Sequence, residues 1–221
     1  MRQLLLDLLP ATTPSLDNFV AGGNAETVTA LTEWLAGSSG EPSFCLWGEA
    51  GSGKSHLLLA SDFDYVDAEA NPTLLNLWDT DQLAVDNVEC LTEVGQIALF
   101  NHFNRLKRDG GRLLTALSQP PAHFNREGGL REDLRTRLGS GLIYRLQPLT
   151  DGEKAAAIAD KAAERAMKLS PEAIDYLLRH APRDMGTLAA LVAALDLHSL
   201  EHKRPITLPL LKEVLASPME T

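Results

Sequence analysis

The stretch Gly48-Glu49-Ala50-Gly51-Ser52-Gly53-Lys54-Ser55 matches every fixed position of the phosphate-binding pattern G-x-x-x-x-G-K-[ST]. Glycines in such a loop let backbone N–H groups curl around phosphate oxygens without a Cβ in the way. In this pattern Lys54 reaches the β- and γ-phosphates, and the Ser55 hydroxyl completes the shell of a Mg²⁺ ion. The stretch therefore predicts a nucleotide site, to which the helix that begins here adds its positive N-terminal end.

The residues on either side favour this interpretation, because the pattern is informative only between a strand and a helix. Ser43–Trp47 is a short apolar run typical of a buried strand, and His56–Ala60 continue as a helix. A glycine turn in an ordinary loop is the alternative, and this strand and helix argue against it.

Composition and charge limit the remaining classes of function. The chain has 221 residues, 44% of them hydrophobic, which is enough for a proper core. Its net charge is −10: residues 1–100 hold two basic and fifteen acidic residues (−13), whereas residues 101–221 hold eighteen basic and fifteen acidic ones (+3). Such an acidic chain argues against autonomous DNA binding, which depends on phosphate contacts. Arginines in the second half form either a solvated face or an edge that meets an acidic or phosphate-bearing partner.

The cysteines and the apolar runs bear on the cellular compartment. Cys45 and Cys90 both lie in or beside apolar strand-like segments, so they are predicted to be small core residues in a reducing compartment, without disulfide or metal spacing. No apolar run approaches the ~20 residues that span a bilayer. Met1–Pro10 is too short for a signal peptide and carries Asp7. We expect a cytoplasmic protein that does not enter a membrane.

The first ten residues stand apart from the rest and read Q-L-x-L-x-L before a Thr/Pro-rich linker. A glutamine that anchors by hydrogen bonds and leucines that fill an apolar pocket suit a tail that docks in a partner's groove. A frayed terminus or an added strand is the alternative. The residues of this pattern are Gln3, Leu4, Leu6 and Leu8.

Periodicity predicts two folded parts. Up to Pro148, helices alternate with apolar strand-like runs, which is typical of a parallel α/β sheet. Beyond Pro148 the sequence predicts four helices and no strand, hence a small all-helical domain. The predicted division is a tail and linker over 1–13, an α/β nucleotide-binding domain over 14–148 and a helical domain over 149–221. The predicted strands are 43–47, 65–68, 82–87, 112–118 and 142–146; the predicted helices are 25–36, 56–60, 92–108, 130–138, 150–167, one from 170, 184–202 and 208–215.

Polar residues at the strand ends extend the predicted site, because the ends of parallel strands face the ligand crevice. Asp86 ends the third strand and is placed to hold Mg²⁺ through water. Asn87 follows it, and an amide cannot accept a proton from an attacking water, so a base is missing there. Ser118, after the fourth strand, would sense the γ-phosphate or simply cap the strand. Upstream, Phe19 and Val20 would pack on an adenine ring.

Together these features resemble the DnaA-related branch of the AAA+ family, and within it the short Hda group, over nearly the whole chain. The residues before the first helix are similar to the family's adenine-side box. The G-K-S-H-L segment is similar to the family's phosphate loop, and the D-N pair is similar to the Hda form of the strand that ends in a magnesium ligand. The resemblance rests on Leu16–Val20, Gly53–Leu57, Val85–Glu89, Ser118–Pro121, Leu134–Leu138 and Arg145–Leu149.

The resemblance implies an AAA+ parallel-sheet domain with a helical lid, a bound ADP or ATP, and Mg²⁺ held by Ser55 and Asp86. It makes Arg137 an arginine finger that acts in trans, and gives Asn87 and Ser118 catalytic positions. Gly186 stands where the family has the arginine sensor of the lid, and Arg183 is expected to substitute. The implied nucleotide contacts are Phe19, Val20, Gly48, Glu49, Ala50, Gly51, Ser52, Gly53, Lys54, Ser55, His56 and Arg183.

The function implied by this resemblance is regulation of replication initiation. The tail is similar to the Q-L-[SD]-L-P-L peptides that dock on the DNA sliding clamp, from which Leu5 and Asp7 depart, and Arg137 would then reach the ATP held by DnaA. Its own ATP turnover is expected to be weak. No basic helix-turn-helix segment follows the lid, so no sequence-specific DNA binding is expected. A helicase loader of the DnaC type and a small-molecule P-loop kinase are the alternatives, and self-association as a homodimer is left open.

Overall fold

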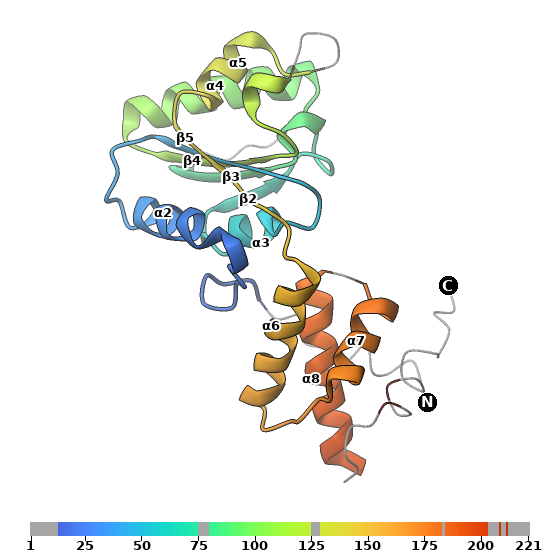
Figure 1. Ribbon diagram of the computed structural model, residues 1–221. Coiled ribbons are helices and arrows are strands. Elements are labelled where there is room, and N and C mark those ends of the chain that lie inside the picture. Colours follow the sequence, from blue (N-terminus) through green and yellow to red (C-terminus); the bar gives the residue numbers. More distant parts are fainter. Residues whose placement is uncertain are drawn as a thin grey trace. The chain divides into compact units, whose positions relative to one another are not determined.

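The computed structural model describes residues 13–74, 80–124, 129–182 and 184–202, together with 208 and 211 (Figure 1). The chain forms two compact units that divide between Pro148 and Leu149. The larger unit, Pro14–Pro148, is an α/β domain, and the described helices after Leu149 form a second, helical unit.

A five-stranded parallel sheet is the framework of the larger unit. The strand order is β2-β3-β4-β1-β5, so β1 and β3 lie on either side of β4. This architecture confirms the predicted α/β class, and each predicted strand boundary lies within one residue of the observed one. The strands are β1 (Ser43–Trp47), β2 (Asp64–Asp67), β3 (Gln82–Asp86), β4 (Arg112–Leu117) and β5 (Leu142–Arg145).

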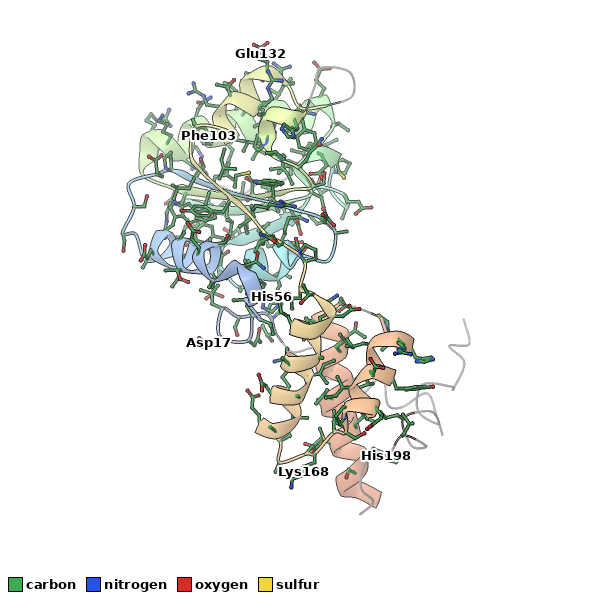
Figure 2. All side chains as sticks on the ribbon, in the orientation of Figure 1. Asp17, His56, Phe103, Glu132, Lys168 and His198 are labelled. Carbon is green, nitrogen blue, oxygen red and sulfur yellow. The ribbon has the colours of Figure 1, made fainter. Side chains whose placement is uncertain are left out.

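Helices cover both faces of this sheet, with α2 and α3 on one side and α4 and α5 on the other (Figure 1). Alternate strand residues point to opposite faces: Phe44 packs on the α2/α3 side, whereas Cys45 packs on the α4/α5 side. Phe103 of α4 packs in the same core layer as Cys45, on the α4/α5 side of the sheet (Figure 2). The helices are α2 (Ala25–Leu35), α3 (Lys54–Leu59), α4 (Glu93–Asp109) and α5 (Glu132–Leu138), and short 3₁₀ turns are η1 (Gly22–Asn24), η2 (Val88–Cys90) and η3 (Pro121–His123).

Two sequence expectations in this unit are corrected. Cys45 is buried, and burial raises the pKa of its thiol to about 12, but Cys90 is exposed. Cys90 ends the η2 turn instead of lying in a strand, so it has no sheet layer to pack against. The helix predicted from Leu130 begins at Glu132, because Arg131 has the extended backbone of an N-terminal cap.

Arg112, the first residue of β4, fixes the C-terminal end of α2. Its guanidinium donates to the carbonyl oxygens of Trp34 and Leu35, both at 2.8 Å. The same group lies 5.5 Å from the Trp34 ring centroid and 5.3 Å from that of Phe63. These bonds satisfy carbonyls that a helix end leaves without intrahelical donors, and the two rings add cation–π attraction.

Replacing Arg112 with lysine should therefore destabilise the α/β unit although the charge is kept. One nitrogen, Nη1, reaches both carbonyls, but a lysine lacks the planar guanidinium that lies over the Trp34 and Phe63 rings. We expect the free energy of unfolding to fall by about 1–3 kcal/mol, measured by urea denaturation. The control is Arg108→Ala, which removes an exposed arginine that pairs with its neighbour Asp109; it should leave the midpoint unchanged. Equal midpoints for the Arg112→Lys variant and the wild type would contradict this role.

The second unit consists of α6 (Asp151–Glu164), α7 (Pro171–His180) and α8 (Met185–His202). A capping box starts α6: Thr150 accepts from the Glu153 N–H, and the Glu153 carboxylate accepts from the Thr150 N–H. The three helices share an apolar core that includes Ile158, Leu177 and Val192. Most of the predicted helix 208–215 lies outside the described residues. In the described part of the chain, no helix combines the length and apolar character needed to cross a bilayer.

Candidate nucleotide-binding site

The phosphate-binding stretch connects the end of β1 to the start of α3, as its pattern requires. Gly53 has φ +97°, and a Cβ there would lie 2.7 Å from a ring carbon of Phe19. A Cβ on Gly48 would collide with the carbonyl oxygen of Leu146. Both glycines are therefore required by the loop itself, which is a geometric reason for the pattern found in the sequence.

Lys54, the first residue of α3, folds over this loop. Its ammonium donates to the carbonyl oxygens of Gly48 (2.7 Å) and Glu49 (3.0 Å). Burial lowers the pKa of Lys54, whereas the nearby negative charges of Asp86 and Glu89 raise it. The ammonium is thus held over the loop by two carbonyl oxygens, at the edge of the sheet where phosphates would bind.

The donors in the loop fit a phosphate group. Ser52 is only 6% exposed, and its Oγ is buried without a hydrogen-bond partner in the described structure. A buried hydroxyl without a partner is costly, and a phosphate oxygen would supply one. The Ser52 hydroxyl and the loop around Gly48 and Gly53 together fit the phosphates of a bound nucleotide. Ser55 is exposed in the first turn of α3, where its hydroxyl is open to a metal ion.

Asp86, at the end of β3, is 1% exposed and already tied into the protein. One carboxylate oxygen accepts from the backbone N–H of Asn87 (2.9 Å), and the other accepts from the Tyr65 hydroxyl (3.1 Å). Burial, followed by the charge of Asp86, raises the pKa of Tyr65 above its usual range. The tyrosine therefore remains a donor at neutral pH and holds the carboxylate in one orientation at the end of β3.

Asn87 adopts left-handed backbone geometry (φ 52°, ψ 44°), which asparagine tolerates better than most residues. Its side-chain amide donates to Asp67 Oδ1 (2.9 Å), at the end of β2. Asn87, which stands where a catalytic base would be expected, thus directs its side chain towards the end of β2. Ser118 is exposed directly after β4, and its backbone N–H donates to Glu89 Oε1 (2.9 Å). Glu89 was not among the predicted site residues.

Phe19 and His56 form the side of the loop where an adenine ring is expected. Their ring centroids are 5.4 Å apart, and Phe19 also covers Gly53. His56, on α3, lies 3.0 Å through Nε2 from the carbonyl oxygen of Ser15, which ties the upstream segment to the helix. Val20 follows Phe19 and is half-buried. The structure thus brings the upstream box and the phosphate loop together.

The three arginines around α5 have different partners. Arg131 pairs with Asp133 (3.0 Å) and Glu93 (3.3 Å), and Arg135 donates to the Phe124 carbonyl oxygen (3.1 Å). Arg137 is half-buried, and its guanidinium lies 5.8 Å from the Phe100 ring centroid. Among the described residues, no carboxylate pairs with Arg137. Of these three arginines, Arg137 is the one that lies against an aromatic ring.

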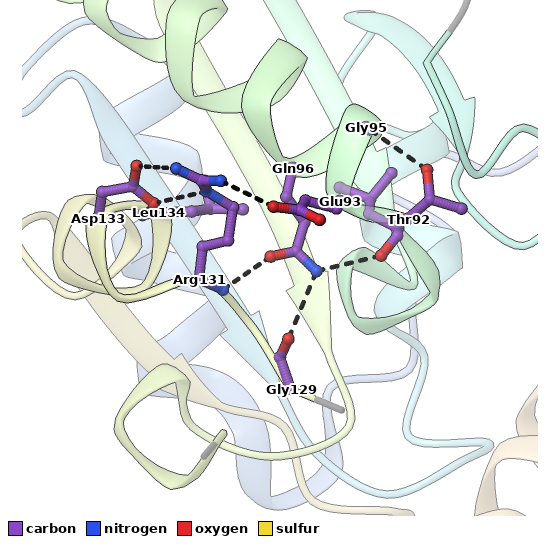
Figure 3. Close-up of polar contacts among 9 residues, drawn as sticks. Thr92, Glu93, Gly95, Gln96, Gly129, Arg131, Asp133 and Leu134 are labelled. Carbon is purple, nitrogen blue, oxygen red and sulfur yellow. Dashed lines mark hydrogen bonds and ion pairs between the residues drawn. The ribbon is translucent and has the colours of Figure 1, made fainter. Parts of the chain in front are cut away.

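An open groove of about 1080 Å³ runs between α4 and α5, and Arg131 and Arg137 both line it. Gln96 also lines it and was not predicted from the sequence. The Gln96 side chain donates to the carbonyl oxygens of Leu91 (3.1 Å) and Gly129 (3.4 Å) and accepts from the Arg131 N–H (2.7 Å) (Figure 3). These bonds join α4 to the segment that leads into α5, and so fix where α5 begins.

A Gln96→Leu variant should lose both stability and the orientation of α5. Gln96 is 6% exposed, so leucine would leave the backbone groups of Leu91, Gly129 and Arg131 without these bonds. We expect the free energy of unfolding to fall by about 2–4 kcal/mol in urea denaturation. The control is Glu93→Gln, whose side chain is 79% exposed and pairs with Arg131; it should behave as the wild type. Unchanged stability of the Gln96→Leu variant would contradict this assignment.

Several predicted residues cannot be placed in this site. The tail residues Gln3, Leu4, Leu6 and Leu8 lie outside the described residues, as does Arg183. Gly186 is exposed in the first turn of α8, within the helical unit. Within the described ranges, no group of three His, Cys, Asp or Glu side chains could hold a metal ion.

Comparison with known proteins adds to this picture. A family model described as "Hda, lid domain" matches residues 151–215, which include all three described helices of the second unit. An uncharacterized protein of Haemophilus influenzae is 29% identical, and the alignment covers 97% of this chain and 98% of that protein. The similarity thus extends through both units.

Two solved structures share the fold. Domain III of the replication initiation protein DnaA from Thermotoga maritima superposes with a TM-score of 0.71 at 19% identity, covering 95% of this chain and 98% of that one. DnaA from Aquifex aeolicus, bound to AMPPCP, superposes with a TM-score of 0.64 at 25% identity, covering 87% of this chain and 69% of that one. The first similarity concerns the fold alone, and the second reaches a protein solved with a nucleotide analogue.

Proposed function

This chain is an Hda-like, DnaA-related AAA+ protein, and on that premise we propose that it binds an adenine nucleotide and regulates the initiation of chromosomal replication. The match of residues 151–215 to the Hda lid domain carries this proposal, because it separates the chain from other proteins with the same sheet. The nucleotide, ADP or ATP with Mg²⁺, would lie on the loop Gly48–Ser55.

The phosphate loop would hold the nucleotide mainly as a structural ligand. Lys54 and the Ser52 hydroxyl would meet its phosphates, Ser55 and Asp86 would meet Mg²⁺, and Phe19 would lie beside the base. A related DnaA binds AMPPCP, which supports the same class of ligand here. Intrinsic hydrolysis is expected to be slow, because the amide of Asn87 donates to Asp67 and cannot take a proton from water.

Arg137 would act outside its own chain. Its guanidinium has no carboxylate partner among the described residues, whereas Arg131 and Arg135 are engaged within the domain. We infer that it reaches the γ-phosphate of ATP held by DnaA and stabilises the negative charge of the transition state. The product would be ADP-bound DnaA, which would stop a second initiation.

The N-terminal tail would bring the protein to the DNA sliding clamp. Gln3, Leu4, Leu6 and Leu8 suit a peptide that docks in an apolar groove of the DNA sliding clamp. Docking would keep the regulator on DNA behind the replication machinery, since the acidic chain itself has little affinity for phosphates. The effective concentration of Arg137 near DnaA on the same DNA would rise accordingly.

A Gln3→Ala/Leu8→Ala variant should lose clamp binding and keep nucleotide binding. We expect its affinity for immobilised clamp to fall by roughly 100-fold, because it lacks both the hydrogen-bonding anchor and one apolar contact. The control is Leu5→Ala, which removes a leucine of similar size outside the pattern. Surface plasmon resonance against the clamp makes the comparison, and equal affinity of all three proteins would contradict the proposed docking.

A further inference from the structure

Glu89 forms a bridge between two strand ends of the nucleotide site. It lies in the η2 turn, directly after β3, and its Oε1 accepts from the backbone N–H of Ser118 at 2.9 Å. Ser118 directly follows β4, the strand between β3 and β1. The carboxylate is thereby held at the edge of the sheet where the phosphate loop begins.

The other oxygen of this carboxylate, Oε2, is buried and has no hydrogen-bond partner among the described residues. Buried carboxylate oxygens are costly to leave unpaired, so such atoms usually have a protein, water or ligand partner. The rest of Glu89 is anchored through Oε1, so this oxygen is held in place without being used by the protein.

Neighbouring groups show which ligand this oxygen faces. The Gly48 N–H donates to the carbonyl oxygen of Leu117 at 3.2 Å, and Leu117 directly precedes Ser118, which Glu89 holds. The Lys54 ammonium in turn donates to the Gly48 carbonyl oxygen at 2.7 Å. In this kind of loop the lysine reaches the β- and γ-phosphates. Glu89 therefore lies on the γ-phosphate side of the predicted nucleotide.

The two aspartates at this edge already accept hydrogen bonds. Both oxygens of Asp86 accept hydrogen bonds, from Tyr65 and from the Asn87 backbone. Asp67 accepts from the Asn87 amide and from the Glu69 N–H through the same oxygen, Oδ1. Glu89 is thus the carboxylate next to Lys54 that combines a fixed position with an unused buried oxygen.

We propose that Glu89 is the carboxylate that accepts the proton in the slow intrinsic hydrolysis at this nucleotide site, in the absence of a base at position 87. This role rests on the proposed binding of ATP to the same loop. Glu89 Oε2 accepts a hydrogen bond from the attacking water and orients it. As the water oxygen bonds to the γ-phosphorus, the bond from phosphorus to the β,γ-bridging oxygen breaks, ADP leaves, and the proton of the water passes to Glu89 and then to solvent.

A purely structural role makes a different prediction. If Glu89 only joins the ends of β3 and β4, glutamine should replace it without loss, because an amide oxygen also accepts from the Ser118 N–H. If Oε2 takes a proton, glutamine should fail, because an amide does not accept a proton in this way. The Glu89→Gln variant therefore separates the two roles, and Glu89→Ala removes both.

The test measures binding and hydrolysis separately, with the full chain in excess over labelled ATP in single turnover. Nucleotide affinity is measured independently with fluorescent ATP and ADP. For Glu89→Gln we expect hydrolysis to slow by about 100-fold and thermal stability to stay unchanged. We also expect its affinity for ATP to rise relative to that for ADP, since a negative charge that faces the γ-phosphate is gone. The matched control is Glu69→Gln, an exposed carboxylate near the same edge, which should match the wild type in both assays.

The outcomes distinguish this assignment from the proposed nucleotide site. Wild-type hydrolysis retained by Glu89→Gln would overturn the catalytic role, and so would a wild-type protein that binds ATP without ever hydrolysing it. If the wild type binds no ATP and no ADP, the proposed nucleotide site itself is wrong, and the role of Glu89 falls with it.

Discussion

An Arg137→Ala variant is expected to lose its stimulation of DnaA-bound ATP hydrolysis while it keeps its own nucleotide and its contact with the clamp. A guanidinium delivered in trans to a transferring phosphoryl group is worth about 10³- to 10⁵-fold in kcat. Arg137 is half-buried above the Phe100 ring and pairs with no described carboxylate, so its removal leaves no buried charge uncompensated. We expect the stimulated rate to fall by about 10³-fold or more.

Two further variants make this test specific. Arg137→Lys keeps the charge but not the planar fork, so it should recover only part of the stimulation. Arg108→Ala removes an exposed arginine at the end of α4 and should stimulate as the wild type does. Phosphate release from DnaA preloaded with labelled ATP reports all three. Full stimulation by Arg137→Ala would exclude this arginine as the finger.

A Lys54→Ala variant should bind ADP and ATP far more weakly than the wild type. The Lys54 ammonium lies over the phosphate loop, bonded to the carbonyls of Gly48 and Glu49, and it is the cation in this loop. Loss of a charge-assisted hydrogen bond to phosphate costs about 1.5–3 kcal/mol, which corresponds to roughly 10- to 150-fold in affinity. Titration with a fluorescent nucleotide measures the change directly.

The control for this experiment is Lys107→Ala, an exposed lysine near the end of α4. It changes the net charge equally and should bind nucleotide as the wild type does. Thermal shift gives a second readout: saturating ADP should raise the Tm of the wild type and the control, and raise that of Lys54→Ala much less. Equal affinities of the wild type and Lys54→Ala would mean that the loop does not bind phosphate.

Local patterns were enough to predict the elements of this fold. The apolar run Ser43–Trp47 predicts a buried strand from its own residues alone. The glycines after it predict a loop that tolerates no Cβ at Gly48 or Gly53. The predicted burial of Cys90 was wrong, because a three-residue turn after β3 carries it to the surface. A turn of three residues is too short to produce a repeating pattern of apolar residues in the sequence.

Contacts between distant residues were beyond reach. Asn24 exchanges two hydrogen bonds with the Gln147 backbone. Nothing in the sequence around either residue indicates that the two lie in contact. Gln96 shares a helical face with the buried residues Leu99, Phe103 and Leu106, so a polar residue at a core position was the available signal. Glu89 gave no comparable signal, since its significance depends on the Ser118 N–H and the Lys54 ammonium, which only the folded sheet brings near it.

Hydrolysis of ATP pre-bound to DnaA is the most direct test of the proposed regulator, measured with this protein added in the presence and absence of clamp loaded on DNA. Hydrolysis is expected to accelerate only when this protein and the loaded clamp are both present, and to return to the basal rate with the Gln3→Ala/Leu8→Ala variant. A rate that stays basal in every combination, while this protein still binds nucleotide, would contradict the account and limit the resemblance to DnaA to the fold.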